Sequence, residues 1–454
     1  MMHTLDKQSG TWKWGIFGLA LLAPFFFLSY GFANHYAASL KAVPSIMFAW
    51  EADIPLWPWS IVPYWSIDLF YGLSLLLCWN KFELKQQILR LFSAQIIAVS
   101  CFLLFPLKFS LVRPELSGFF GLWFDVLMGF DQPFNQAPSL HIVLLVILWD
   151  FYRRHVNGSW KLLVDCWSFL IGLSVLTTWQ HHFIDIPTGI LVGAFCLWLF
   201  PLQVKAPYSA QKQPKHTKRH ARLALLYSLA AILLCLVAYL LKSWALWLLY
   251  PSLSLILVAC AYVLDRPHFF QKDPQGQISA AAQILFAPYF LCAWLNSRIW
   301  TKAHPEDSFI VTLGSVELYL GRIPSMQHAK SFDALFDCCA ELPRPNHPHH
   351  YASYSLDLTT VQAMQLQCAV NELDHAINTL THHTSPQKIL VFCALGYSRS
   401  SCTLVAWLLT HHNADSVAEA ISIIQNARPW IVINPAQQLE LEQFHLMLQG
   451  AQSC

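Results

Sequence analysis

A cysteine and an arginine separated by five residues form the first candidate site in this sequence. The segment 389–401 begins as an apolar run typical of a strand, continues through a short loop and ends in a helical pattern. Cys393 stands at the end of the run and Arg399 at the start of the helical pattern. Backbone N–H groups in such a loop converge on an anion, and the helix N-terminus adds positive potential. Because this field favours a thiolate, the pattern predicts a phosphate cradle with a cysteine nucleophile.

The other loop residues have separate expected roles. The planar guanidinium of Arg399 can bind two phosphoryl oxygens and hold them in the transition state. Gly396 lets the backbone turn tightly, and Ser400 can donate a hydrogen bond that helps the thiolate leave a phosphocysteine intermediate. The residues that we expect around the phosphate are Ala394, Leu395, Gly396, Tyr397 and Ser398. A buried structural cysteine beside a helix-capping arginine is the alternative interpretation of the bare spacing.

Three polar clusters in the hydrophobic half of the chain form a second candidate site. Their members are Lys108, Arg113, Ser139, His141, His181 and Asp185. Ionisable residues at membrane depth are costly and therefore indicate function, although helix-end anchoring is the alternative. Phosphoryl transfer through histidine needs a basic clamp, an imidazole oriented by a carboxylate and a second imidazole as acid. A metal site is also conceivable, but the nearby cations favour an anionic ligand, so we predict no metal and no cofactor.

The composition places most of the chain in a lipid bilayer. Of the 454 residues, 56% are hydrophobic and only 12% are charged, which is too apolar for a soluble protein. The net charge of +2 gives no field that would attract nucleic acid, so we expect no nucleic-acid partner. The 13 cysteines lack the spacing of a zinc site or a disulfide framework. Apart from Cys393, we therefore interpret most of them as small buried apolar residues.

Apolar runs that approach the roughly 20 residues of a bilayer-spanning helix define the predicted membrane spans. The runs are 15–33, 57–79, 91–107, 139–152, 160–179, 187–204, 223–241 and 244–264. The segment 279–297 is uncharged but is interrupted by Pro288 and Asn296. It therefore fits both a ninth span and a helix lying at the membrane interface.

Basic residues in short loops set the expected orientation, because such loops prefer the cytoplasm. The residues that mark this side are Lys81, Lys85, Arg153, Arg154, Lys212, Lys215, Lys218, Arg219 and Arg222. Alternation of the spans then places the N-terminus in the cytoplasm, and the loops 107–138 and 180–186 with their polar clusters on the outer face. Eight spans return the chain to the cytoplasm, so we expect a multi-pass protein of the inner (cell) membrane with a cytoplasmic C-terminal region.

Changes in composition divide the chain into three segments. Residues 1–204 form a predicted six-helix membrane domain, 205–304 a basic linker with two or three further membrane helices, and 305–454 a soluble domain. The soluble segment mixes strand-like alternation with helical patterns. The expected fold class is a multi-pass all-α membrane domain with additional helices, followed by an α/β domain with a central mixed sheet.

The segment 309–448 resembles the dual-specificity branch of the protein tyrosine phosphatase superfamily. The matching motifs are Leu-Tyr-Leu-Gly-Arg at 318–322, Cys-Ala-Leu-Gly-Tyr-Ser-Arg-Ser-Ser at 393–401, Ala-Arg-Pro at 427–429 and Ile-Asn at 433–434. Phe392 departs from the family, which usually has His before the cysteine. The resemblance implies an aspartic acid that protonates the leaving alkoxide from a loop ahead of the cysteine. Asp357 fits that position, with Asp333 and Asp337 as lesser candidates.

The histidine clusters resemble those of the type 2 phosphatidic acid phosphatase (PAP2) superfamily, whose third motif carries His-x3-Asp. The resemblance implies that His181 is the nucleophile, that Asp185 orients it and that His141 protonates the leaving group. The residues that it implies around the phosphate are Lys108, Arg113 and Ser139. We interpret the adjacent His182 as an interfacial residue.

The membrane domain also departs from the PAP2 pattern. Lys108 and Arg113 are closer together than usual, and Val175 stands where the superfamily has an arginine. The pattern is more similar to the branch that includes inositol phosphosphingolipid synthases, in which the same histidines transfer a head group to an alcohol. Hydrolysis and head-group transfer therefore both remain open for this site.

The two resemblances together cover nearly the whole chain and match bacterial fusions of a PAP2 domain with a dual-specificity phosphatase domain. They imply a membrane-bound phosphatase in phospholipid metabolism, whose substrate is a lipid phosphate or another phosphomonoester and whose other partners are membrane lipids. One alternative is a head-group transferase joined to a protein or phosphoinositide phosphatase. Another is a scaffold whose phosphatase-like folds only bind phosphate.

Overall fold

The chain folds into two compact units, residues 1–206 and 207–454. The computed structural model describes residues 6–129, 131–209, 218–381 and 385–452. Lys212 and Lys215, which mark a predicted cytoplasmic loop, lie outside the described residues. The predicted segment 205–304 falls almost entirely in the second unit, and its separation as a third segment stays a prediction.

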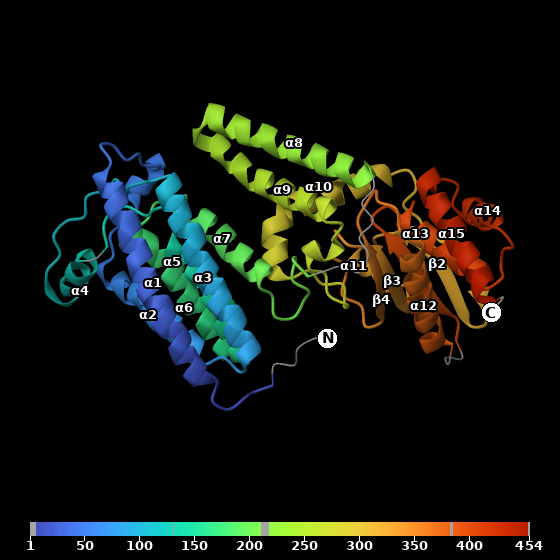
Figure 1. The fold of residues 1–454 in the computed structure, drawn as a ribbon, viewed down its shortest axis with the longest axis horizontal. Helices are drawn as coiled ribbons and strands as arrows, with labels where there is room; N and C mark the ends of the chain where they lie inside the picture. Colours follow the sequence, from blue (N-terminus) through green and yellow to red (C-terminus); the bar gives the residue numbers. More distant parts are fainter. Residues whose placement is uncertain (1–5, 130, 210–217, 382–384, 453–454) are drawn as a thin grey trace. The chain divides into compact units, whose positions relative to one another are not determined.

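The first unit is built from helices and contains no strand within its described residues. Asn80 and Ser139 begin two of these helices, because their side chains accept hydrogen bonds from backbone N–H groups of the first turn. The helices, coloured blue to green in Figure 1, are α1 (Thr11–Ser39), α2 (Ile61–Leu76), α3 (Lys81–Leu104), α4 (Gly118–Met128), α5 (Leu140–His155), α6 (Trp160–Thr177) and α7 (Asp185–Leu199), with short 3-10 helices at Ala49–Asp53 and Pro58–Ser60.

Helix α4 lies in the segment 107–138, which we predicted as a connection between two spans. The helix itself was not predicted, and the outward orientation of the segment stays a prediction. The helix has 11 residues and is apolar, but it is far shorter than the roughly 20 residues that a search for spans requires. Gly121, Phe124 and Leu127 are buried at three-residue spacing, which is the pattern of one helix face. An apolar helix of this length is too short to be found by a search for apolar runs of spanning length.

Helices α5 and α7 pack closely because two glycines of α7 face α5. A Cβ atom at Gly189 would lie 2.8 Å from the Cβ of Ile142, and one at Gly193 would lie 2.7 Å from the Cβ of Val146. Small residues allow such close approach between membrane helices. The packing brings the start of α5, where His141 lies, near the start of α7, where Asp185 lies.

The second unit begins with helices that pack side by side (Figure 1). They are α8 (Lys218–Leu241), α9 (Leu249–Val263) and α10 (Ala280–Trp300), with short 3-10 helices at Ser243–Leu248 and Pro267–Phe270. Tyr227 of α8 contacts Tyr262 of α9 and Tyr289 of α10, with ring centroids 5.5 and 5.9 Å apart. Helix α10 continues through Pro288, so the segment 279–297 is helical almost throughout.

Within the described residues, five helical segments are long and apolar enough to cross a membrane. They are α1, α3, α6, α8 and Ser243–Val263, which contains α9. The predicted spans 57–79, 139–152 and 187–204 correspond to α2, α5 and α7, which have only 16, 16 and 15 residues. At 1.5 Å per residue such helices reach roughly 23–24 Å, less than the ~30 Å hydrocarbon core. The apolar helices are those of a membrane protein, while the number of crossings stays a prediction.

A mixed sheet forms the centre of the C-terminal region, as predicted. The strands are β1 (Ser308–Leu313), β2 (Val316–Arg322), β3 (Ala334–Cys339), β4 (His350–Ser355) and β5 (Gln387–Cys393), in the order β1-β2-β5-β3-β4. Strand β1 is antiparallel to β2, and all other neighbours are parallel. The carboxyl ends of the parallel strands therefore meet at one edge, where ligands bind in such sheets.

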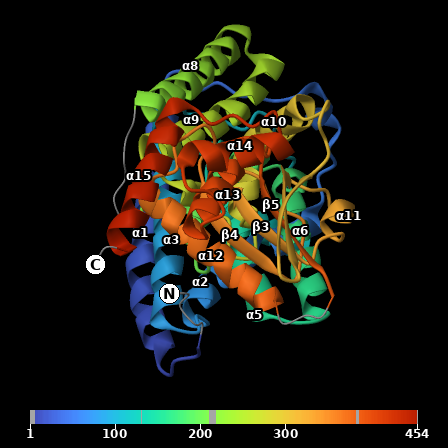
Figure 2. The same ribbon diagram turned by 90° about the vertical axis from the view of Figure 1, so that its right-hand side faces the viewer.

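Helices cover the sheet and are connected to it by short loops. They are α11 (Met326–Ala329), α12 (Ala363–Leu380), α13 (Arg399–Thr410), α14 (Val417–Ala427) and α15 (Pro435–Gln452). Figure 2 shows α12 to α15 in front of the strands. Ile389 and Val391 of β5 pack toward α12 and α13, whereas Leu390 and Phe392 pack on the other face, where Ala293 of α10 joins the cluster. Helix α10 is thus part of the packing around the sheet.

Candidate active sites

Strand β5 and helix α13 place Cys393 at the start of the predicted phosphate loop. Cys393 is the last residue of β5, and α13 begins at Arg399. Gly396 in the loop has φ +71°, and a Cβ atom there would lie 2.3 Å from the carbonyl oxygen of Gly321. Only glycine fits this backbone conformation at such close approach.

Groups outside the loop bind its carbonyl oxygens. Ser297 Oγ donates to the carbonyl of Ala394 (2.5 Å), Arg428 Nε to that of Gly396 (3.0 Å) and Val432 N to that of Tyr397 (2.8 Å). In a trans peptide the N–H points opposite to the C=O. The N–H groups of Leu395, Tyr397 and Ser398 therefore point away from these partners, toward the loop interior. Gln437 fixes the loop further by donating from Nε2 to Ser398 Oγ at 2.7 Å.

Two hydrogen bonds reach the sulfur of Cys393. The backbone N of Gly396 lies 3.2 Å from Sγ, and the hydroxyl oxygen of Ser400 lies 3.3 Å from it. Burial alone would raise the pKa of the Cys393 thiol, but the Arg399 guanidinium and the hydrogen bonds of Ser400 hold this pKa below its ordinary value. The geometry therefore favours the thiolate although Phe392 replaces the histidine of the family.

Arg399 is held by a ring of acceptors. Its Nη1 donates to Glu341 Oε2 and to the Ser355 carbonyl, both at 2.7 Å, and its Nη2 donates to Asp357 Oδ1 at 2.9 Å. The side chain is only 2% exposed. Burial by itself would lower the pKa of the guanidinium, but Glu341 and Asp357 raise it well above its ordinary value. Arg399 is thus a fixed cation beside Cys393.

Glu341 was not singled out from the sequence. It is buried just after β3 and accepts from both Arg399 and the backbone N of Asp357. The carboxylate therefore connects the phosphate loop to the loop that follows β4. The sequence carries no local signal for this role. Only the structure shows that Glu341 directly follows the continuously buried run 334–340, where a charge needs a partner.

Asp357 is the predicted acid that the structure places beside Arg399. It lies on the loop after β4, its side chain is 33% exposed, and its backbone carbonyl accepts a hydrogen bond from Tyr262 of α9 at 3.1 Å. Asp333 instead accepts from the backbone N of Lys388, at the opposite end of β5 from Cys393. Asp337 is buried in β3, where Lys272 Nζ lies 2.6 Å from its Oδ2. The two lesser candidates therefore have structural partners away from the loop.

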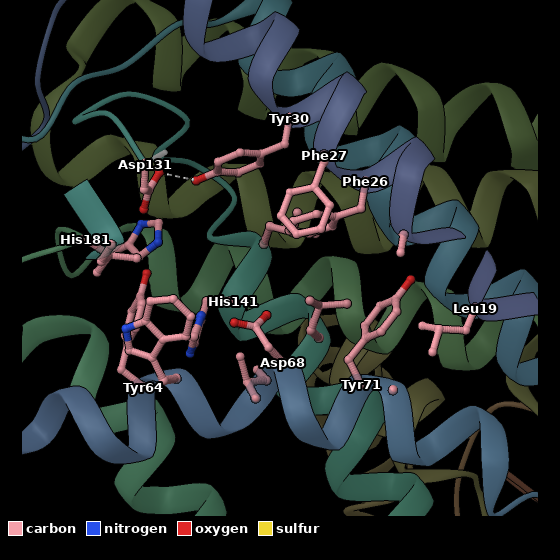
Figure 3. A pocket seen from close by; sticks show the side chains of 17 residues that line it. Leu19, Phe26, Phe27, Tyr30, Tyr64, Asp68, Tyr71, Asp131, His141 and His181 are labelled. Carbon is pink, nitrogen blue, oxygen red and sulfur yellow. Dashed lines mark hydrogen bonds between the residues drawn. The ribbon is translucent and has the colours of Figure 1, made fainter. Parts of the chain in front are cut away.

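His141 and His181 line the same pocket in the first unit (Figure 3). The pocket has a volume of about 390 Å³. Figure 3 shows both imidazoles at one end, with Asp131 beside His181 and Asp68 beside His141, while Leu19 and Phe27 extend toward the other part of the pocket. The ring of His141 stacks on Tyr64, with centroids 4.1 Å apart. One end of this pocket is polar and the remainder is apolar, which suits an amphipathic ligand.

Asp185 contacts His181 as the motif predicts, with Oδ2 3.1 Å from Nδ1. The neighbouring His182 is buried, and its place at the membrane interface stays a prediction. The backbone N of Ser110 donates to His182 Nε2 at 3.1 Å, so Nδ1 carries the proton that Glu51 accepts at 3.0 Å. His182 is therefore a structural residue that joins three segments of the first unit.

The three residues predicted to hold phosphate at the histidine site do not line its pocket. Lys108 is exposed. Arg113 donates from Nε and Nη2 to the carbonyls of Thr178 and Trp179, both at 3.0 Å, at the end of α6. Ser139 is buried and caps α5. Arg113 thus binds backbone carbonyls at a helix end, which are strong acceptors, and the phosphate-binding role of the three residues stays a prediction.

Sequence reasoning missed other polar residues of this pocket. Asp131 is buried and accepts a hydrogen bond from the hydroxyl of Tyr30 at 2.9 Å, and Asp68 lies in the middle of α2. Asp68 interrupts the predicted apolar span 57–79, and an ionisable residue at such a place is itself a signal of function. Across the parts of the chain that the structure describes, no group of three or more His, Cys, Asp or Glu side chains has the arrangement of a metal site.

Comparisons with known proteins bear on the C-terminal region. Residues 318–446 match the family described as dual specificity phosphatase, catalytic domain. The tyrosine-protein phosphatase pmp1 of Schizosaccharomyces pombe is 24% identical over 146 residues, which are 29% of this chain and 52% of that protein. The chain thus spans about half the length of this curated relative.

Solved phosphatase structures are also similar to the C-terminal region. PTPMT1 in complex with PI(5)P has 21% identity, a TM-score of 0.25 and coverage of 30% of this chain and 94% of that one. Human DUSP28 has 20% identity, a TM-score of 0.26 and coverage of 31% and 96%.

Proposed function

We propose that the dual-specificity phosphatase domain formed by the C-terminal region hydrolyses phosphomonoesters with Cys393 as nucleophile. One observation carries this proposal: Gly396 N and Ser400 Oγ donate hydrogen bonds to Cys393 Sγ, in a loop whose inward N–H groups and buried Arg399 are arranged for an anion. A buried structural cysteine needs neither these donors nor a lowered pKa. Cys402, in the same core, is an ordinary buried cysteine. Burial, and to a lesser extent the neighbouring Cys393, raise the pKa of its thiol to about 12.

The proposed reaction has two steps. The Cys393 thiolate attacks phosphorus, the bond from phosphorus to the leaving oxygen breaks, and the carboxylic acid of Asp357 protonates that oxygen. Arg399 and the loop N–H groups bind the three other phosphoryl oxygens as charge develops. In the second step, Asp357 takes a proton from water, whose oxygen attacks the phosphocysteine, and Ser400 donates to the departing thiolate. Inorganic phosphate and the starting enzyme result.

Replacement of Cys393 by Ser in the full chain tests this function, with Cys402→Ser as the matched control. The first variant should lose hydrolysis of a soluble phosphomonoester, because an alkoxide at neutral pH is far scarcer than a thiolate. The second should retain it. Full activity of Cys393→Ser would refute the proposal, whereas a binding-only scaffold predicts no hydrolysis even by the unmodified chain.

We also propose a second phosphoryl-transfer site at His141 and His181, acting on a lipid phosphate in phospholipid metabolism. The shared pocket and the Asp185 contact to Nδ1 support His181 as nucleophile and His141 as acid. The apolar side chains along the rest of the pocket suit acyl chains. In a Cys393→Ser background, His181→Ala should lose hydrolysis of the lipid phosphate, and His181→Ala alone should retain the Cys393 activity on a soluble phosphomonoester. Unchanged lipid hydrolysis in the double variant would refute this site.

Head-group transfer is the second candidate for the histidine site. It is favoured by Asp68 and Asp131, because carboxylates are acceptors for alcohol hydroxyls whereas no lysine or arginine lines this pocket among the described residues. Two labelled lipids distinguish the two candidates. Hydrolysis releases inorganic phosphate from a lipid phosphate, whereas head-group transfer takes the phosphorylated head group from a phosphodiester phospholipid, releases diacylglycerol and forms a new phosphodiester only when an acceptor alcohol is present.

The topology that we propose keeps α10 on one side of the membrane and the phosphatase domain in the cytoplasm. Just before α10, Lys272 bonds Asp337 of β3, and near its end Ser297 bonds Ala394 of the phosphate loop. Both ends of α10 are thus held by one folded domain, while a crossing helix has its ends on opposite sides. A reporter fused to the C-terminus tests this: a cytoplasm-only reporter should be active, and activity of a periplasm-only reporter would contradict the topology.

A further inference from the structure

A basic pocket borders the loop that carries Asp357. It has a volume of about 590 Å³ and lies between the first turns of α8 and the loop that follows β4. Its lining residues are Lys218, Arg219, Arg222, Leu223, Leu226 and Leu358. Leu358 is the residue next to Asp357, so the pocket and the Cys393 site share one loop.

The three cations of this pocket are not neutralised by neighbouring acids. Among the described residues, no carboxylate lies within ion-pair distance of Lys218, Arg219 or Arg222. The preceding segment 210–217 contains no Asp or Glu in its sequence. A concave surface with three uncompensated positive charges attracts an anion.

The apolar part of α8 places this pocket at a membrane surface. Helix α8 is long and apolar enough to cross a bilayer, and large apolar side chains are exposed along it from Leu225 to Leu241. The basic residues occupy the first turns of the helix, immediately before this apolar stretch. Lysine and arginine at such a boundary lie at the level of the lipid head groups, where each contributes attraction for anionic lipids.

Helices α9 and α10 also hold the two catalytic loops near the level of the lipid head groups. Tyr262 near the end of α9 donates to the carbonyl of Asp357 at 3.1 Å, and Tyr397 of the phosphate loop donates to the carbonyl of Trp300 at the end of α10. Leu358 is 47% exposed, and Leu226 of α8, which lines the same pocket, is 53% exposed. An exposed apolar side chain on a catalytic loop, beside an exposed apolar helix face, suits contact with lipid.

We propose that Lys218, Arg219 and Arg222 bind a second anionic group of a membrane phospholipid whose terminal phosphomonoester is cleaved at Cys393. The substrate class is therefore a phospholipid with a phosphodiester near the glycerol and a phosphomonoester on its head group. Leu223, Leu226 and Leu358 contact the apolar side of the same molecule. This inference rests on the proposed function of Cys393 and adds the substrate class to it.

The test compares four substrates with the full chain carrying His181→Ala, so that the proposed histidine site does not contribute to lipid hydrolysis. Two probes are lipids in vesicles of a neutral phospholipid: a phosphatidylinositol monophosphate, which has both groups, and phosphatidic acid, which has only the monoester. The other two are soluble: the inositol phosphate head group of the first lipid, and nitrophenyl phosphate. The variant Lys218→Gln/Arg219→Gln/Arg222→Gln removes the cations, and Lys85→Gln/Lys161→Gln/Lys388→Gln is the control for total charge. The measured quantity is the ratio of kcat/KM for each lipid to kcat/KM for nitrophenyl phosphate.

The basic-pocket variant should lower the ratio for phosphatidylinositol monophosphate by about 10²-fold, on the scale that three surface cations contribute to binding an anionic lipid. The ratio for phosphatidic acid should fall much less, and the control variant should leave both ratios unchanged. An unchanged phosphatidylinositol ratio, or an equal fall for both lipids, would overturn the second anion site. A loss confined to soluble inositol phosphate head groups would show that free phosphates, and not lipids, occupy the pocket, which also overturns the proposal.

Cys393→Ser in the same assay separates this proposal from the function on which it rests. If this variant still hydrolysed nitrophenyl phosphate, the function of Cys393 would fail whatever the basic pocket does. If it were inactive while the basic-pocket variant kept its lipid ratio, only the substrate class proposed here would fail.

Discussion

Replacement of Glu341 by Gln tests whether a buried carboxylate holds Arg399 in the phosphate loop. The two side chains are almost fully buried, and Nη1 of Arg399 lies 2.7 Å from Oε2 of Glu341. A hydrogen bond to a charged group contributes about 1.5–3 kcal/mol, and Gln keeps the shape of Glu but removes its charge. Arg399 retains its bonds to Asp357 and to the Ser355 carbonyl. We therefore expect a loss in this range, and not the larger cost of an isolated buried charge.

The loss has two measurable consequences. If the lost energy appears in the transition state, kcat/KM for a soluble phosphomonoester falls by roughly 10–160-fold. If the same energy is lost from the folded state, Tm of the phosphatase domain falls by roughly 3–12 °C. Steady-state kinetics and thermal unfolding of the full chain in detergent measure both.

Glu442→Gln is the matched control, because Glu442 is exposed on α15. This variant should change neither quantity. Glu341→Gln with unchanged kcat/KM and unchanged Tm would refute the positioning role of the carboxylate. A fall in Tm with an unchanged kcat/KM would reduce Glu341 to a structural residue.

The remaining predictions concern proton transfer at the two sites. Asp357→Asn should lower kcat/KM, which reports formation of the phosphocysteine, by roughly 10²–10⁴-fold on esters with poor leaving groups and much less on nitrophenyl phosphate, while an equal fall of kcat/KM on both would show a structural role. The pKa of Cys393 lies below its ordinary value. The thiolate therefore persists when the pH falls below the ordinary thiol pKa of about 8.5, and it is protonated only when the pH falls through the lower pKa. The acid limb of kcat/KM should therefore lie below that pH and should move upward in Ser400→Ala; a limb that stays in place would exclude Ser400 from thiolate stabilisation. His141→Ala should remove the lipid phosphatase activity that remains in Cys393→Ser, and by itself it should not change the pH profile of the Cys393 site on nitrophenyl phosphate; a changed profile in well-folded protein would show that the two sites belong to one pathway.

The cysteine site was largely predictable because its geometry is local. Cys393, the loop and Arg399 are contiguous in sequence, so an apolar strand and a helix start were sufficient to predict how they lie. Asp357 came from the family resemblance, and the structure places it beside Arg399. Glu341 was missed because its role depends on the pairing of β3 with β5, which brings the carboxyl ends of two strands together. No local pattern announces such a partner.

The histidine site was less predictable from the sequence than the cysteine site. His181 and Asp185 are four residues apart and meet as the motif predicts, but the basic clamp does not form around the pocket. Sequence spacing gave no information on Arg113, because the carbonyls that it binds belong to the end of α6. Asp131 escaped attention because it lies outside every motif and is brought to His181 only by helix packing. Contacts between segments that are distant in sequence, and not residue types, determine where Arg113 and Asp131 lie.

The covalent intermediate provides the most direct test of the central claim. Asp357→Asn should form the phosphocysteine from nitrophenyl phosphate but hydrolyse it slowly, because the base for the second step is missing. Mass spectrometry of the acid-quenched full chain should then find one phosphoryl group on the peptide that contains Cys393. Turnover of nitrophenyl phosphate by this variant with no phosphoryl group on the Cys393 peptide would contradict the account.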